Sequence, residues 1–130
     1  AALVAFNAFL ADMAAVAGCL PVKLAETGEV TVGEHLYELS SVSAKFRANV
    51  MIQGALAVRA GMPLILVDGF DVAVGGNRVA LMKVLHHLNT EHGVKSVITM
   101  ATPSIPPDTL EVFKNFSRVY WVKQGTAQEL

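Results

Sequence analysis

The feature that most constrains the fold is a run of four aliphatic residues at positions 64–67, Leu-Ile-Leu-Val, which lies between Pro63 and Asp68. The run is too short for a helix and presents no polar side chain to solvent, a pattern typical of a strand buried on both faces of a parallel sheet. Parallel strands are joined by long crossovers, usually helices. We therefore expect an α/β fold with residues 64–67 as a central strand and Asp68 at its carboxyl end.

The composition agrees with a single α/β domain over residues 1–130. Hydrophobic residues make up 53% of the chain and charged residues only 16%, which excludes a disordered chain. Lys and Arg total 10 against 11 Asp and Glu, so no net basic field attracts DNA, and any DNA contact would come from a local patch or a larger assembly. The single Cys19 excludes an internal disulfide and favours a reducing, cytoplasmic compartment.

Residues 1–20 predict a helix over about residues 2–18, because apolar side chains recur at spacings of three and four until Gly18 and Pro21 end the pattern. The opposite face is also mostly apolar, so this helix is either deeply packed or the end of a longer helical arm. The residues before Cys19 imitate a lipoprotein cleavage site, but the stretch has no basic residue and contains Asn7 and Asp12. We expect neither a targeting segment nor a membrane span.

The remaining elements follow from changes in periodicity and from turn residues. A short β-hairpin is expected over residues 22–39, with its turn at Gly33 and Glu34, and residues 40–130 form the α/β core. Alternation of helices and strands in this core predicts right-handed crossovers and a mainly parallel sheet flanked by helices. The expected core elements are a helix over about 44–60, the strand 64–67, a helix between Asn77 and His92, a strand at 96–99, a loop at 101–107, a short helix from 108 or 109 to 116, and a last strand at 119–122.

Chemistry is expected at the carboxyl ends of the strands, where loops and helix amino termini converge in open parallel sheets. Three segments reach that edge in the expected fold: residues 68–76, residues 99–103 and the end of the last strand. Asp68 could hold Mg2+ through a water and so position a nucleotide phosphate, or it could simply cap the loop. Spacing alone leaves both interpretations open.

The order of several motifs points to a family. Residues 41–47, Ser-Val-Ser-Ala-Lys-Phe-Arg, open a helix; then come the strand that ends in Asp68, Phe-Asp-Val at 70–72 and a Gly-Gly-Asn-Arg helix start at 75–78. This order covers nearly the whole chain and resembles the carboxyl-terminal lobe of ABC-type ATPases of the SMC and RecF kind, most closely the SMC-like ATP-binding proteins of phages and prophages. The resemblance implies a P-loop-NTPase-like fold and a role with ATP and Mg2+ in DNA maintenance or repair.

The resemblance also implies roles for single residues. Ser41 and Ser43 correspond to the signature segment, which in that family binds the γ-phosphate held by an opposite protomer. Arg47 corresponds to the arginine that follows this segment in the family. Asp68 corresponds to the Walker B aspartate, a catalytic and metal-binding residue. Hydroxyls and free N–H groups at a helix amino terminus suit an anion, although ordinary N-capping explains the two serines equally well.

The sequence departs from the family pattern at several positions. Gly69 stands where the family keeps a catalytic glutamate, so Asp71 is the nearest carboxylate that could substitute. Met100 replaces an expected histidine, with Thr102 nearby as a nucleotide-binding candidate. No Gly-x-x-x-x-Gly-Lys-Ser/Thr phosphate loop occurs in the chain. ATP and Mg2+ would therefore bind only together with a complementary N-terminal ATPase half.

Two functions are compatible with this sequence. In the first, the chain is the ATP-linked lobe of such an ATPase, with the N-terminal half as its partner, DNA reached through the full assembly, and no hydrolysis by the chain alone. In the second, it is a catalytically inactive interaction or oligomerisation module that has kept the fold, because Gly69, Met100 and Ala44 each lack a polar group that turnover requires. Whether the chain is an enzyme is left open.

Three histidines lie on or just after one expected helix, at His86, His87 and His92. Spacings of five and six residues do not align them for a metal as an i, i+4 pair would. We expect them to be solvated surface side chains.

Overall fold

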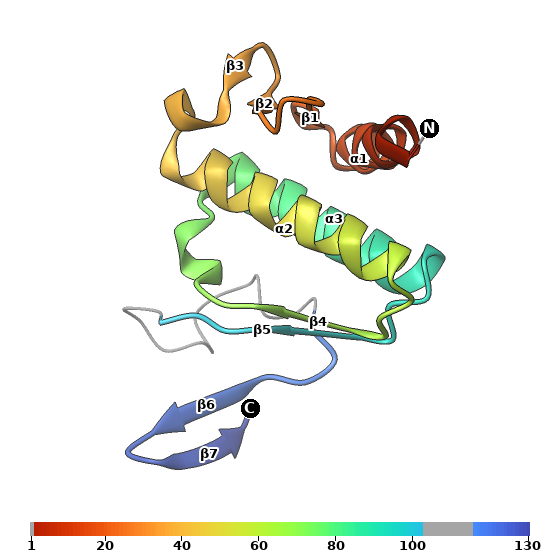
Figure 1. Cartoon of the computed structure of the whole chain (residues 1–130). Coiled ribbons are helices and arrows are strands. Elements are labelled where there is room, and N and C mark those ends of the chain that lie inside the picture. The colour runs from red at the N-terminus through yellow and green to blue at the C-terminus, as the bar shows by residue number, and fades with distance from the viewer. Residues whose placement is uncertain (1, 103–115) are drawn as a thin grey trace.

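The computed structural model describes residues 2–102 and 116–130, and its elements stack in layers (Figure 1). Two long helices, α2 and α3, lie side by side in the middle, with α1 and three short strands on one side and the pair β4–β5 on the other. A separate hairpin, β6–β7, lies beyond β4–β5, on the side away from the helices. The helices are α1 (Ala2–Ala17), α2 (Val42–Arg59) and α3 (Gly75–Glu91). The strands are β1 (Val22–Leu24), β2 (Val30–Val32), β3 (His35–Leu36), β4 (Leu64–Val67), β5 (Ser96–Thr99), β6 (Tyr120–Lys123) and β7 (Thr126–Glu129).

Helix α1 packs its apolar stripe into the core, as the spacing predicted, and is joined to the strand that follows it. Phe6, Leu10 and Met13 are buried on this stripe. Asn7 donates from Nδ2 to the carbonyl of Leu24 (2.8 Å), and the Leu24 N–H donates back to Asn7 Oδ1 (2.9 Å). The side-chain amide of Asn7 thus satisfies the backbone N–H and carbonyl of Leu24, as a neighbouring strand would, and connects β1 to α1.

The first sheet has the antiparallel order β1-β2-β3. The expected turn at Gly33 and Glu34 is present, because β2 ends at Val32 and β3 begins at His35. Two details of the predicted hairpin are wrong: β1 adds a third strand, and Tyr37–Leu39 forms a 3-10 turn rather than a continuation of β3. Leu39 is largely exposed, so burial on a sheet does not hold these residues in an extended conformation.

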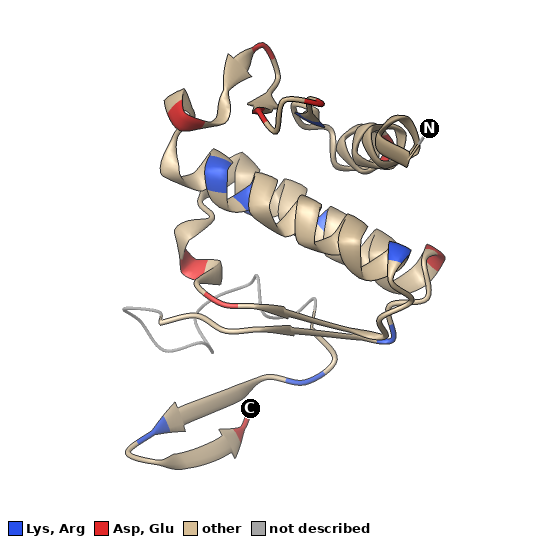
Figure 2. Cartoon of the chain, in the orientation of Figure 1, with Lys and Arg blue, Asp and Glu red and all other residues tan. Residues whose placement is uncertain are grey.

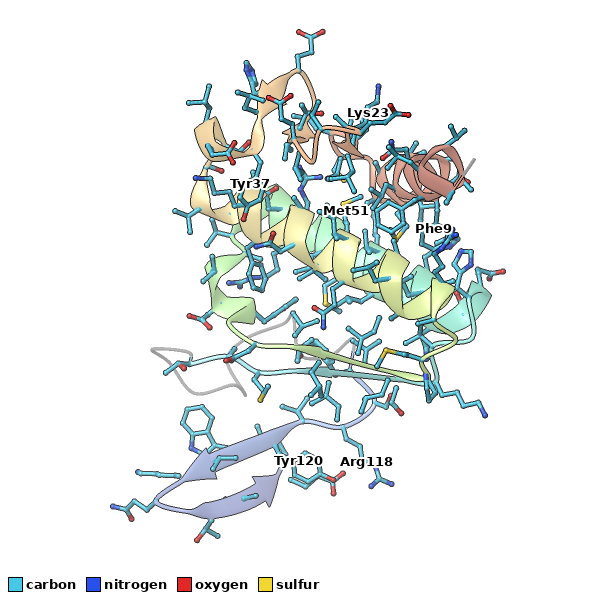
Figure 3. The ribbon with its side chains drawn as sticks, viewed as in Figure 1. Phe9, Lys23, Tyr37, Met51, Arg118 and Tyr120 are labelled. Carbon is cyan, nitrogen blue, oxygen red and sulfur yellow. The ribbon has the colours of Figure 1, made fainter. Side chains whose placement is uncertain are left out.

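Helices α2 and α3 are in close contact because small side chains line α2. A Cβ atom at Gly54 would lie only 2.6 Å from Cδ1 of Leu88, so glycine is what allows the two backbones to approach here. Met51, Leu81 and Leu88 are fully buried, and each such side chain contributes roughly 1.5–3 kcal/mol through removal from water. Figure 3 shows Met51 between the helices and the α1 layer.

Strands β4 and β5 form a two-stranded parallel pair, which confirms both predicted strands and their parallel pairing. Along β4 the side chains alternate: Ile65 and Val67 are buried on the side of α2, whereas Leu64 and Leu66 are exposed on the opposite side. In the described residues no third strand pairs with either β4 or β5. The prediction of a central strand buried on both faces is therefore wrong, because helices cover one face only.

The hairpin β6–β7 also corrects a prediction. Its first strand matches the expected last strand, but it pairs antiparallel with β7, which the sequence had not indicated, and it belongs to a separate sheet. The end of the last strand consequently does not join the carboxyl edge of β4 and β5. In the part of the chain that the structure describes, the expected mainly parallel sheet is limited to one parallel pair. The expected helix ending near residue 116 and most of the proline-rich loop lie outside the described residues.

None of the described helices is long and apolar enough to cross a membrane. Across residues 2–102 and 116–130 the fold class is α/β, built from three α-helices and small sheets.

Candidate functional site

The loop that joins β4 to α3 carries the two carboxylates predicted from the sequence, Asp68 and Asp71. After Asp68 the chain turns at Gly69, whose φ of 75° lies in the left-handed region that glycine tolerates best. A 3-10 turn at Phe70–Val72 follows, in which Phe70 is buried and its N–H donates to the carbonyl of Met100 (2.9 Å). The Phe70 ring also packs edge-on against Phe116, with centroids 6.0 Å apart. The loop is thus tied to the end of β5.

The two candidate carboxylates of this loop have different partners. Asp68 is exposed, and its Oδ1 accepts from the N–H of Gly69 (2.8 Å). Asp71 is also exposed, and its Oδ1 accepts from the N–H of Thr102 (3.2 Å). This hydrogen bond joins the loop after β4 to the segment after β5, at the carboxyl ends of the two strands. No group of three or more His, Cys, Asp or Glu side chains within residues 2–102 and 116–130 is placed to hold a metal ion.

The two serines at the start of α2 both accept backbone hydrogen bonds. Ser41 is the N-cap, and its side chain accepts from the N–H of Ala44 (3.2 Å), which satisfies one of the free donors of the first turn. Ser43 is buried, and its Oγ accepts from the N–H of Val74 (3.3 Å), directly before α3. The amino terminus of α2 therefore adjoins the loop after β4, as the phosphate-site hypothesis requires, while each hydroxyl already has a partner inside the fold.

Arg47 lies inside the protein rather than on a ligand-facing surface. Its side chain is 2% exposed; Nε donates to Oδ1 of Asn77 (3.1 Å) and Nη1 donates to the carbonyl of Leu20 (2.9 Å). The guanidinium thereby connects α2 to the start of α3 and to the segment after α1. No carboxylate within the described part of the chain pairs with it, so neutral oxygens and the sulfur of Met51 provide its surroundings.

The face of β4 and β5 that the helices leave uncovered is a second candidate site. We call it the open sheet face and define it by Leu64, Leu66, Ile98 and Met100, which are 40%, 49%, 48% and 45% exposed. Leu66 lies directly opposite Ile98 in the parallel register, so the four side chains form one patch. Figure 2 shows that charged residues flank these strands but do not lie along them. The open sheet face is therefore uncharged and largely apolar, with exposed Ser96 beside Leu64 as its one polar residue on the two strands.

A groove runs along the free edge of β4, between the strand and α2. It is lined on the α2 side by Ile52, Gln53 and Leu56, and on the other side by Met62 and Leu64. Gln53 donates from Nε2 to the carbonyl of Leu66 (2.8 Å). The carbonyl of Val67 accepts from the N–H of Met100, directly after β5, so the carbonyl of Leu66 points to the opposite, free edge of β4. There it accepts the hydrogen bond from Gln53.

Sequence reasoning missed both the open sheet face and a pair of histidines. Exposed Leu64 and Leu66 have the same chemical character as buried Ile65, so no signal in the run 64–67 separates the two faces. His87 and His92 have their Nε2 atoms 3.1 Å apart, and both are half-buried, whereas His86 is exposed as expected. The signal for this pair was Gly93, which marks the end of the helix just after His92.

Comparison with known proteins adds no family. The chain matches no protein-family model, no curated protein and no solved structure.

Proposed function

We propose that this chain is an interaction module that associates with a second copy of itself through the open sheet face. The observation that carries the proposal is the exposure of four large apolar side chains on one contiguous face of β4 and β5. Contiguous apolar patches on a protein surface mark sites of interaction, because their removal from water is worth about 25 cal/mol per Å².

Self-association suits this face because no charge has to be buried. The strands β4 and β5 contain no Asp, Glu, Lys or Arg, so two copies can be apposed face to face without the desolvation of an unpaired ion. A closed dimer would use the same patch on both copies. The C-terminal hairpin lies on this side of the sheet and leaves the four side chains 40–49% exposed.

Packing through the face is favoured over strand addition at the edge of β4. The amide of Gln53 already occupies the Leu66 carbonyl on that edge, and an added strand would have to displace it. The face requires no such exchange. The proposed interface therefore joins layers rather than extending the sheet.

The test compares one charge placed on the open sheet face with the same charge placed elsewhere. Sedimentation equilibrium of the full chain over a range of concentrations should show a dimer, and Leu66→Glu should weaken it by at least about tenfold, since a carboxylate would have to be buried without a partner. Leu39→Glu is the matched control, because Leu39 is exposed but lies in the 3-10 turn after β3. It should leave the dimer intact.

A chain that stays monomeric at every concentration would contradict the proposal. An equal effect of Leu39→Glu and Leu66→Glu would also contradict it, because the loss of association would then not be specific to the open sheet face.

The second candidate is the ATP-linked lobe of an SMC or RecF-like ATPase, acting with an N-terminal half and through that assembly on DNA. It is favoured by the Ser43–Val74 and Asp71–Thr102 hydrogen bonds, which bring the start of α2 and the ends of β4 and β5 to one edge. It ranks second because β4 has a strand neighbour on one side only in the described residues, so Asp68 does not emerge from the middle of a sheet.

Titration with Mg2+-ATP separates the two candidates. For the ATP-linked lobe, joining the chain to a phosphate-loop half should give binding that Asp68→Ala weakens about tenfold or more, because a carboxylate near the metal is lost. An absence of nucleotide binding in the joined protein, with a concentration-dependent dimer of the chain alone, favours the interaction module.

A further inference from the structure

A hollow at the carboxyl end of α3 holds a pair of histidines that neither function uses. His87 and His92 have their Nε2 atoms 3.1 Å apart, with the ring planes at 76°. The ring of Phe9, from α1, packs edge-on against His92 with centroids 4.7 Å apart. Figure 3 shows Phe9 on the side of α1 that faces this end of α3. The hollow is lined by Asp12, Ala15, Val16, His87, Glu91 and His92.

The end of the helix is what brings the two imidazoles together. In a continuous helix, side chains five residues apart point about 140° away from each other. Here α3 ends at Glu91, and His92 is the C-cap, with φ −120° and ψ 15°. Gly93 follows at a φ of 73° and ends the helix, and the His92 ring lies against that of His87.

We propose that His87 and His92 are two ligands of a site for Zn2+ or a similar transition-metal ion, completed by a carboxylate of the same hollow. Zinc binds imidazole nitrogen at about 2.0–2.1 Å in tetrahedral geometry, which places two ligating nitrogens about 3.3 Å apart. The observed Nε2 separation is close to that value, so both nitrogens can reach one ion when the two rings turn toward it.

The third ligand comes from Glu91 or Asp12, both of which line the hollow. Glu91 lies four residues after His87 and thus on the same side of α3. Asp12 approaches from α1, and its ligation would connect the two helices through the metal. In the described residues no three such side chains are already gathered, so one exposed carboxylate must rotate toward the imidazoles when the metal binds.

The charges around the hollow favour a cation. Two carboxylates line it and no Lys or Arg does, among the residues that the structure describes. The carboxyl end of α3 adds the partial negative charge of its free carbonyl groups. Without a metal, the short Nε2 separation is explained by one neutral ring donating to the other, and metal binding replaces that hydrogen bond.

The test is calorimetric titration of the full chain with Zn2+ alone. We expect one ion per chain, and a loss of affinity of about tenfold or more in both His87→Gln and His92→Gln, because each removes one of few ligands. His86→Gln, one residue from the pair, should bind as the unchanged chain does. All proteins carry Cys19→Ser, so that binding by the free thiol does not contribute.

NMR of the imidazole nitrogens in the unsubstituted chain supplies a measurement that does not depend on the variants folding. Zinc should shift the signals of His87 and His92 and leave those of His35 and His86 in place. No binding at about 1 mM zinc, or equal affinity in His86→Gln and both pair variants, would overturn the site.

Asp12→Asn and Glu91→Gln identify the third ligand. If zinc affinity falls only in Asp12→Asn, and zinc raises the melting temperature of the unsubstituted chain, the ion lies between α1 and α3. A loss confined to Glu91→Gln would place it on α3 alone, and unchanged affinity in both would overturn the carboxylate assignment.

Discussion

The layer formed by α2 and α3 and the pair formed by β4 and β5 are both rich in aliphatic side chains, yet their surroundings differ. The helices have α1 on one side and the strands on the other, so residues such as Leu88 and Met51 are fully buried. The strands have helices on one side only, and Leu66 and Ile98 remain about half exposed. Similar hydrophobicity therefore has opposite consequences: it stabilises the fold in the helices and supplies a surface for association on the strands.

The largest expected effect tests this difference directly. Leu88→Ala should lower the free energy of unfolding by about 2–5 kcal/mol, because it leaves a cavity in a fully packed contact. The same change at Leu66 should cost below about 1 kcal/mol, since that side chain is already half exposed. Urea denaturation of the monomer, followed by circular dichroism, measures both. Equal losses would show that the open sheet face is covered in solution.

The next effect concerns how α1 is connected to the helical layer. Arg47→Met keeps much of the volume but removes hydrogen bonds to Leu20 and Asn77, and we expect a loss of about 2 kcal/mol. The same denaturation experiment measures it, with Arg59→Met on the exposed last turn of α2 as the control. A gain in stability would show instead that burial of the charge costs more than its hydrogen bonds return.

A smaller effect tests how closely α2 and α3 pack. Gly54→Ala should cost about 1–2 kcal/mol, because the added methyl group would overlap Leu88 at 2.6 Å. In a chain that already carries Leu88→Ala, the same change should cost little or nothing. A double-mutant cycle measures this coupling. Additive losses would mean that the helices separate to accept the methyl group.

The smallest effect is expected at the C-terminal hairpin. Val122 is 67% exposed, so Val122→Thr should change stability by no more than about 0.5 kcal/mol. Val67→Thr is the matched change in a buried strand position and should cost more, because a hydroxyl would be buried on the helix side of β4. Thermal unfolding of the two variants gives the comparison. A large loss at Val122 would show that the hairpin is part of the cooperative core.

The parts of the site that could be predicted are those that depend on neighbours in sequence. Ser41 is the N-cap of α2, and Asp68 directly follows a strand, as the local patterns indicated. The partner of Ser43 is Val74, and Asn77 and Leu20 surround Arg47; these residues are distant in sequence, and no local pattern connects them. Whether the hydroxyls and the guanidinium were free for a ligand therefore could not be predicted.

By itself the sequence determined the helices, the two parallel strands and the turns between them, because periodicity, caps and glycine positions act over a few residues. Only the tertiary structure decided that β4 has an exposed face and that His87 meets His92. Burial depends on which layers are present to cover a surface, and two side chains meet through the path of the whole backbone. Neither is contained in the hydrophobicity of a short segment.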